Sequence, residues 1–302
     1  MENCYISKFI GYCKFQKGLD NKTVKAYSID LRQYSVFSGG KIEKDILTCF
    51  IEYLQKSYKP KTVKRKIAAL KAFVNYLCFE EIIEHNPFLK IKTTIKQPLI
   101  LPKTIPLNVI NKILECAYAQ CNYSDTEYQQ KTIMRDIAIL ELLFATGARV
   151  SEICSLKAEN ISINDRYIKI LGKGSRERII QIENEDVIKA LLNYERTFLK
   201  SITLIGYFFI NKRNNRISEQ SVRLMIKKYA KMSGYKKNVT PHMFRHSFAT
   251  LLLEEDVDIR YIQKLLGHSS ITTTQIYTHV STAKQREILA TKHPRNKIVI
   301  NF

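Results

Sequence analysis

The sequence predicts a mainly α-helical chain of two domains, the second of which also holds a small three-stranded antiparallel sheet. Apolar residues recur at helical spacing through most of the chain. Prolines concentrate between Asn86 and Pro106, where four of the seven lie. β-Branched residues alternate along the segment from Ile161 to Ile182, around two tight-turn signals. A chain of 302 residues is long enough for two domains with cores of their own.

Four helices are expected in the N-terminal domain, which we place at residues 1–96. Asp20 or Asn21 can cap the second helix, and Gly39 can end it. Pro60 suits the first turn of the fourth helix, because a backbone N–H is not needed there. The first three helices are expected at about residues 3–16, 21–38 and 45–58, and the fourth from Pro60 to about residue 85.

An extended linker is expected at residues 97–106. Prolines lie within it and just before it. Each proline removes a backbone donor and disfavours helix, so this stretch is typical of a connection between domains. We therefore place the second domain at residues 107–302.

The second domain is expected to be mostly helical. An apolar segment at about residues 131–145 predicts a central helix, which Gly147 can end. The sheet is expected next, with tight turns at an Asn-Asp pair and at a Gly-Lys-Gly sequence. The other helices are expected at about residues 107–121, 184–200, 218–232, 241–255, 258–266 and 271–278.

The chain is strongly basic, with 49 Lys and Arg against 28 Asp and Glu and a formal net charge of +21. Residues 1–96 carry 18 basic and 9 acidic side chains, and the remainder carries 31 and 19. This balance favours a polyanionic partner, with nucleic acid ahead of an acidic membrane. A chain that is basic without such a partner is the alternative. No run of 18 apolar residues occurs, and lysines interrupt the apolar pattern of the first residues, so neither a membrane span nor a signal peptide is expected.

The seven cysteines indicate a reducing compartment. No C-x-x-C pair occurs, and most of these residues lie in apolar helical patterns. We expect buried free thiols, a cytoplasmic location and no zinc site. The cysteines are Cys4, Cys13, Cys49, Cys78, Cys116, Cys121 and Cys154.

A group of basic residues lies largely off the apolar stripe of the fourth helix. We interpret these residues as a surface that contacts the phosphate backbone of nucleic acid, the alternative being a solvated helix face. They are Lys61, Lys64, Arg65, Lys66 and Lys71.

Four of the six histidines lie between Pro241 and Val280. His242 and Arg245 are three residues apart, at the start of the helix expected from Pro241, so they share one face. A helix N-terminus attracts anions, and an imidazole and a guanidinium there would bind phosphate. A capped surface helix with an incidental His and Arg is the alternative. We interpret His246 as a structural histidine.

Three further positions suggest phosphate chemistry. Arg149 follows the expected helix end at Gly147, and Glu152 can hold its guanidinium in place. Lys173 stands at the tip of the expected hairpin. The alternatives are a surface ion pair and a solvated turn lysine.

The segment "LLGHSSITTTQIYTHV" adds His268 and Tyr277. A phenol with a pKa near 10 is a poor nucleophile at neutral pH unless positive charge surrounds it. This chain supplies such charge. An ordinary half-buried tyrosine is the alternative, and His279 is interpreted as incidental.

Together these residues resemble the catalytic pattern of the tyrosine recombinases, of the phage integrase and Xer type. The pattern has, in order, Arg149, Lys173, His242-x-x-Arg245, His268 and Tyr277. The layout is similar too, with a small helical core-DNA-binding domain, a proline-rich linker and a mostly helical catalytic domain. The resemblance implies a SAM-like N-terminal domain and an α+β tyrosine-recombinase catalytic domain.

The resemblance also implies a role for each residue. Tyr277 would form a 3′-phosphotyrosine, Lys173 would protonate the departing 5′-oxygen, and Glu152 would support Arg149. The two arginines would bind the non-bridging oxygens, and His242 and His268 would bond the phosphate and assist proton transfer. No metal or cofactor is required for this chemistry.

Double-stranded DNA is the implied partner, with a homo-tetramer on two sites and strand exchange through a Holliday junction. The participation of a second, related recombinase is left open. The tail after Tyr277 ends in "KIVINF", and we expect it to dock onto a neighbouring subunit, the alternative being its own domain. Two other functions remain: a type IB topoisomerase, and a DNA-binding architectural protein without catalysis.

Overall fold

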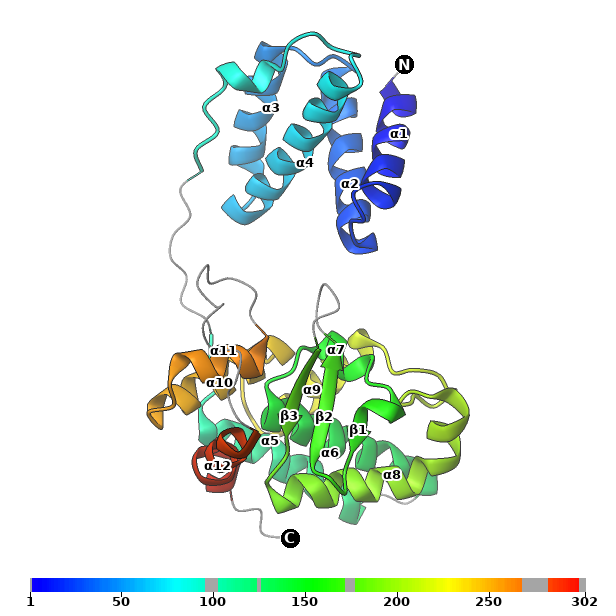
Figure 1. Cartoon of the computed structure of the whole chain (residues 1–302), viewed down its shortest axis with the longest axis vertical. Helices are drawn as coiled ribbons and strands as arrows, with labels where there is room; N and C mark the ends of the chain where they lie inside the picture. Colours follow the sequence, from blue (N-terminus) through cyan, green and yellow to red (C-terminus); the bar gives the residue numbers. More distant parts are fainter. Residues whose placement is uncertain (1, 96–102, 124–125, 172–176, 268–281, 299–302) are drawn as a thin grey trace. The chain divides into compact units, whose positions relative to one another are not determined.

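A computed structural model describes residues 2–95, 103–123, 126–171, 177–267 and 282–298. The chain divides into two compact units, Met1–Ile100 and Leu101–Phe302. The first is helical, and the second combines helices with a three-stranded antiparallel sheet (Figure 1). The predicted fold class is confirmed. None of the helices in the described residues is long and apolar enough to cross a membrane.

The first unit is built from helices that enclose an apolar core. Asp20 caps α2 by accepting a hydrogen bond of 2.9 Å from the backbone N–H of Thr23. Pro60 occupies the first turn of α4, as expected. The core includes Phe9 from α1 and Phe50 from α3, each 1% exposed. The elements are α1 (Glu2–Phe15), α2 (Asn21–Ser38), α3 (Lys44–Ser57), α4 (Pro60–Phe79) and the 3₁₀ helix η1 (Pro87–Lys90).

One side chain of the predicted DNA-facing group is buried instead. Lys66 is only 6% exposed, and its ammonium donates to the buried carboxylate of Asp30 over 2.9 Å. Arg65 pairs with the same carboxylate but keeps 43% of its side chain exposed. A buried carboxylate on α2 needs a cation, and Lys66 supplies it from α4. The prediction that Lys66 faces DNA is therefore wrong.

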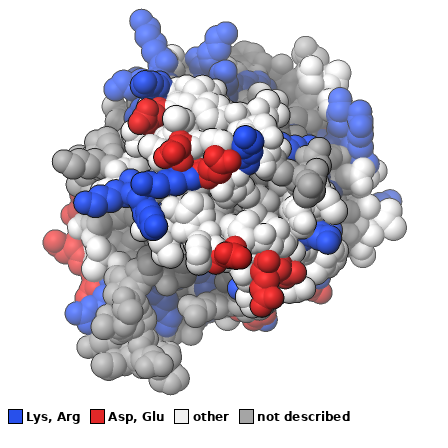
Figure 2. Space-filling view, turned by 90° about the horizontal axis from the view of Figure 1, so that it is seen from above, with Lys and Arg blue, Asp and Glu red and all other residues white. Residues whose placement is uncertain are grey.

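The other members of that group reach the surface to different extents. Lys61 and Lys64 are exposed. Lys71 is half-buried and donates to the hydroxyl of Thr93 over 2.5 Å. On the face drawn in Figure 2, Lys and Arg side chains are spread widely, with Asp and Glu side chains among them.

The second unit is organised around α6 (Glu127–Thr146), which packs against α5, α7, α8, α9 and α10. Its last three turns are buried on all sides. Thr126 caps it, so the helix begins four residues before the predicted start at 131. Gly147 ends it at φ +58°, as expected.

The predicted elements of this unit that lie in the described residues occur in the predicted order, with some shifts. The helices at residues 150–154 and 282–292 were not predicted. Gly206, at φ +75°, ends α8 later than expected. The helices are α5 (Leu107–Ala119), α6, α7 (Val150–Cys154), α8 (Glu185–Ile205), α9 (Glu219–Met232), α10 (Pro241–Glu254), α11 (Ile259–Leu266) and α12 (Thr282–Lys292). The 3₁₀ helices are η2 (Gln120–Tyr123), η3 (Ala158–Asn160) and η4 (Pro294–Lys297). The helix expected at 271–278 lies outside the described residues.

The sheet has the strand order β1 (Ile161–Ser162), β2 (Tyr167–Leu171) and β3 (Glu177–Gln181), all antiparallel. Ile168 on β2 is paired with Ile180 on β3, and both side chains are fully buried. The sheet therefore contributes one apolar face to the core of the unit.

The end of the linker is attached to α10. Ile105 is 1% exposed, and the hydroxyl of Ser247 bonds both of its backbone groups. That hydroxyl donates to the Ile105 carbonyl over 3.0 Å and accepts from the Ile105 N–H over 2.6 Å.

The tail packs on its own unit as far as Ile298, which is 5% exposed. Arg295 is completely buried and bonds Glu141 of α6. His293 is 4% exposed, and its Nε2 lies 2.8 Å from the carbonyl oxygen of Ala145. A buried carboxylate in the central helix therefore holds residues 293–298 in place, and docking of the tail onto a neighbouring subunit stays a prediction. Residues 299–302 lie outside the described part.

Candidate active site

The first part of the site is the turn after α6. Gly147 must be glycine there, because a Cβ atom would lie 2.5 Å from the Phe248 ring and the residue has a positive φ. Arg149 follows and stands at the N-cap of α7. Its backbone N–H donates to Glu152 over 2.7 Å, and its guanidinium donates to the same carboxylate over 2.9 Å. The predicted Arg149–Glu152 pair therefore lies where α7 begins.

A second arginine also binds Glu152. Arg178, on β3, donates from Nη1 and Nη2 to the two carboxylate oxygens, over 3.1 and 2.7 Å. Only 11% of the Arg178 side chain and 7% of the Glu152 side chain are exposed. Burial alone would raise the pKa of Glu152, but the hydrogen bonds from Arg178 and from the Arg149 backbone lower it below its ordinary value. Glu152 is thus a carboxylate at neutral pH.

The third arginine comes from α10. Arg245 is 5% exposed and donates to the carbonyl oxygens of Gly147, over 2.9 Å, and Leu266, over 2.6 Å. Burial and the neighbouring charges of Arg149 and Arg178 lower the pKa of Arg245 to about 10. Its guanidinium is still charged at neutral pH.

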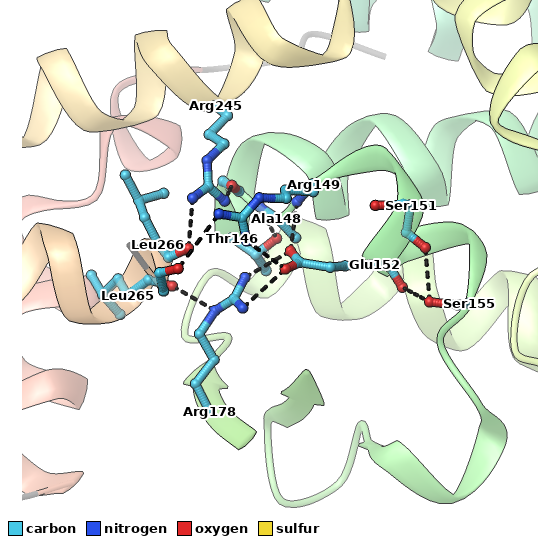
Figure 3. Close-up of polar contacts among 12 residues, drawn as sticks. Thr146, Ala148, Arg149, Ser151, Glu152, Ser155, Arg178, Arg245, Leu265 and Leu266 are labelled. Carbon is cyan, nitrogen blue, oxygen red and sulfur yellow. Dashed lines mark hydrogen bonds and ion pairs between the residues drawn. The ribbon is translucent and has the colours of Figure 1, made fainter. Parts of the chain in front are cut away.

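The three guanidinium groups meet at the C-terminal end of α11 (Figure 3). Arg178 donates to the carbonyl of Leu265 over 2.9 Å, Arg245 to that of Leu266, and Arg149 lies 3.5 Å from that of Gly267. Carbonyls at a helix C-terminus lack partners within the helix, and the negative end of the helix dipole favours cations. The end of α11 therefore organises the arginines, which we call the arginine cluster: Arg149, Arg178 and Arg245.

The cluster has an excess of positive charge. Three guanidinium groups surround the single carboxylate of Glu152, which leaves a local charge of about +2. Arg149 is the most exposed member, at 37% of its side chain. Such a cluster is suited to binding an anion with several oxygens, such as a phosphate diester.

The histidines of α10 lie beside the cluster. His242, in the first turn, is exposed, and His246 is half-buried. Burial lowers the pKa of His246, and the nearby His242 and Arg245 lower it further. His242 is therefore the histidine of this helix that is accessible to a ligand.

Lys173, His268, Tyr277 and His279 lie outside the described residues. In the sequence, Lys173 lies five residues before Arg178, and His268 directly follows Gly267. In the described part of the chain, no group of three or more His, Cys, Asp and Glu side chains is arranged to hold a metal ion.

Arg178 is the member of the arginine cluster that the sequence interpretation missed, although a signal was present. In a strand, residues two apart face the same side. Arg178 is two and four residues from Ile180 and Ile182, which are both buried, so the sequence predicts that it faces the same side. A charged residue in the apolar register of a strand needs a partner, and this one has Glu152.

Family models match most of the chain. A model of the phage integrase family matches residues 105–284, and one of the phage integrase N-terminal SAM-like domain matches residues 6–81. The chain belongs to the phage integrase family. A protein named tyrosine recombinase from Agathobacter rectalis is 50% identical over 295 residues, which are 96% of each chain. This member of the family is thus an enzyme, a tyrosine recombinase, and the resemblance predicted from sequence is confirmed.

Relatives named for Xer recombinases match this tyrosine recombinase over nearly its whole length. Tyrosine recombinase XerC of Thermodesulfovibrio yellowstonii is 36% identical and covers 97% of both chains. Tyrosine recombinase XerD of Listeria innocua is 34% identical and covers 97% of this chain and 99% of its own.

Solved structures support the same fold. XerH site-specific recombinase bound to a palindromic difH substrate has a TM-score of 0.70 at 21% identity, over 95% of this recombinase and 84% of that chain. A lambda integrase tetramer bound to a Holliday junction has a TM-score of 0.65 at 19% identity, over 90% and 75%.

Proposed function

We propose that this recombinase cuts and rejoins DNA at a short specific site through a covalent bond to Tyr277. The phenolic oxygen attacks the scissile phosphorus, and the bond from phosphorus to the 5′-oxygen breaks. The DNA is left joined to Tyr277 through a 3′-phosphotyrosine, and the 5′-oxygen leaves as a hydroxyl after taking up a proton. Attack by a 5′-hydroxyl of the partner strand reverses the step and releases the tyrosine.

The arginine cluster is the observation that supports this chemistry. Phosphoryl transfer depends on positioning and on stabilising charge around the transferred group. In our proposal Arg149 and Arg245 bind the non-bridging oxygens, Glu152 orients Arg149, and no metal or cofactor takes part. The excess positive charge also favours the phenolate of a nearby tyrosine.

The remaining roles rest on the family pattern. Lys173 donates the proton to the leaving 5′-oxygen, while His242 and His268 bond the phosphate and assist proton transfer. The exposed position of His242 on the first turn of α10 supports its role, since backbone N–H groups at a helix start also favour an anion.

The partner we propose is double-stranded DNA in the cytoplasm, bound as a tetramer on two sites and exchanged through a Holliday junction. The core-binding domain, at residues 1–96, would join the catalytic domain, at residues 107–302, in holding the DNA. Lys61 and Lys64 remain exposed for phosphate contacts. The similarity to both XerC and XerD supports either four copies of this chain or pairs formed with a second recombinase.

The first experiment tests the nucleophile. The binding site is mapped by footprinting, and a nicked duplex carrying that site is incubated with the protein and run on a denaturing gel. The unmutated protein should give a covalent adduct, and Tyr277→Phe should give none while binding DNA within about threefold, because only one hydroxyl is removed. Tyr128→Phe is the matched control, since Tyr128 is exposed on α6 away from the cluster. An adduct with Tyr277→Phe would show that another residue is the nucleophile.

A second arm tests the proposed absence of a metal. Adduct formation should be unchanged in excess EDTA, because side chains supply all the positive charge. Loss of the adduct in EDTA with recovery in Mg²⁺ would contradict the mechanism.

A further inference from the structure

Arg178 connects three segments that meet at the proposed active site. It lies on β3, bonds both oxygens of Glu152 at the start of α7, and donates from Nε to the carbonyl of Leu265 in α11 (Figure 3). The segment that bears Lys173 leads directly into β3, and the one that bears His268 leaves α11 after Gly267. Arg178 therefore connects the elements that adjoin three proposed site residues, which are Lys173, His268 and Arg149.

The local backbone leaves room for this side chain. Gly267 ends α11 at φ +64°, and a Cβ atom there would lie 2.9 Å from Nη1 of Arg178. Only glycine allows the guanidinium to lie against this turn. The contact between Arg178 and the end of α11 thus depends on both residues.

Arg178 is also placed to act through other residues and not on DNA directly. Three of its five N–H groups are used by Glu152 and Leu265, and 11% of the side chain is exposed. Arg149, by comparison, has 37% of its side chain exposed. Of the two arginines that bind Glu152, Arg149 therefore has the more accessible guanidinium.

We propose that Arg178 is a positioning residue: it fixes the Glu152 carboxylate that orients Arg149, and it fixes the end of α11 from which the His268 segment leaves. This inference rests on the proposed function, in which Arg149 and His268 act on the scissile phosphate. A lysine would supply charge but could not bond both oxygens of Glu152 and Leu265 together, because only the planar guanidinium presents donors in that geometry.

The role has a consequence for pH. Within the described ranges, the charged groups that face Glu152 are Arg149, Arg178 and Arg245. The hydrogen bonds from Arg178 keep the pKa of Glu152 low against the effect of burial. Without Arg178, burial would dominate and the pKa of Glu152 would rise. Glu152 would then take up a proton at a higher pH than in the unmutated protein and would release Arg149.

The test compares adduct formation by Arg178→Ala, Arg178→Lys and the unmutated protein between pH 8 and pH 5. Arg178→Ala should bind the mapped DNA site within about threefold but cleave about 10²-fold more slowly at pH 8, because the phosphate-binding groups are misplaced. Its rate relative to the unmutated protein should fall further toward pH 5. Arg178→Lys should lie between the two. The ion pair of Arg223 with Glu219, whose side chains are 45% and 25% exposed, supplies the control Arg223→Ala, which should cleave at the unmutated rate.

The double variant Arg178→Ala/Glu152→Gln separates positioning from a general loss of structure. Both changes act on one contact, so the double variant should cleave no more slowly than the slower of Arg178→Ala and Glu152→Gln. Its rate relative to the unmutated protein should not depend on pH, because glutamine does not titrate. If Arg178→Ala does not fold, as judged by circular dichroism, Arg178→Lys is compared with Arg178→Lys/Glu152→Gln in the same way. If the Arg178 variants cleave as fast as the unmutated protein at every pH, the positioning role of Arg178 is wrong, while the proposed function stands. Absence of an adduct with the unmutated protein would overturn the proposed function and this inference with it.

Discussion

The guanidinium of Arg295 donates two hydrogen bonds, of 2.7 and 2.8 Å, to the carboxylate of Glu141, and neither side chain is exposed. The hydroxyl of Tyr118 donates to the same carboxylate over 2.8 Å. Arg295 belongs to η4, near the end of the chain, and Glu141 to the central helix α6. The C-terminal segment is therefore part of the core of its own unit.

Arg295→Ala should strongly destabilise the chain. It leaves the carboxylate of Glu141 buried without its cation, and removing one partner of a buried pair typically costs about 3–5 kcal/mol. The free energy of unfolding in urea measures the effect. Lys297→Ala is the control, because Lys297 pairs with Glu255 at the surface and should cost about 1 kcal/mol or less. Equal costs for the two variants would contradict the prediction. Deletion of the residues after Ala290 should destabilise at least as much as Arg295→Ala, because it also removes the buried His293 and Ile298.

Stability should fall with acid through His293. The Nδ1 atom accepts a hydrogen bond of 2.9 Å from the Arg295 N–H, so it carries no proton, and burial lowers the pKa of His293 to about 4. The unfolded chain has a histidine pKa near 6.5 and binds a proton first, so the contribution is intact above about pH 6.5 and is lost as the pH falls toward 4. The free energy of unfolding should fall by about 3 kcal/mol as a result.

Urea unfolding at pH 7 and pH 5 measures this slope. His293→Asn cannot titrate but can still accept from the Arg295 N–H, so its stability should depend less on pH. The exposed His85 gives the control His85→Asn, which should keep the slope of the unmutated protein. A slope unchanged in His293→Asn would exclude His293 as its source.

Gly147→Ala should cost more stability than Gly206→Ala. Both glycines end a helix at positive φ, which costs alanine about 1–2 kcal/mol. No atom lies within 4 Å of a Cβ at Gly206, whereas one at Gly147 would lie 2.5 Å from the Phe248 ring and add about 1–3 kcal/mol of overpacking. The difference between the two unfolding free energies therefore isolates the steric part, and equal values would show that Phe248 can move away freely.

Lys173→Ala should cleave ordinary DNA about 10²- to 10⁴-fold more slowly, because the strongly basic 5′-oxygen needs a proton to leave. The variant should recover nearly the unmutated rate when sulfur replaces the bridging 5′-oxygen at the scissile bond, since a thiol with a pKa near 8.5 leaves without a proton. Adduct formation on the two substrates is the measurement. An equal defect on both would assign Lys173 to charge binding and leave proton donation to another residue.

The regular elements could be predicted because local signals agree with burial. Gly147 follows an apolar helix and ends it, and Pro60 stands in a first turn. The Arg149–Glu152 pair was also predictable, since a spacing of three places both residues on one helical turn.

Contacts between distant segments could not be predicted in this way. Lys66 looked exposed by helical spacing, but Asp30, 36 residues earlier, holds it in the core. Arg178 lies 26 residues from Glu152, and Arg295 lies 154 residues from Glu141. In each case a buried carboxylate pairs with a cation that only the tertiary structure brings near. The strand register indicates that Arg178 is buried, but no local pattern identifies its partner.

The bonds between Ser247 and Ile105 make a mechanical connection. The chain enters its second unit already tied to α10, two residues from Arg245, by a hydroxyl that holds both the N–H and the carbonyl of Ile105. A force applied to the chain at Ile105 would therefore act on α10 through this pair of hydrogen bonds.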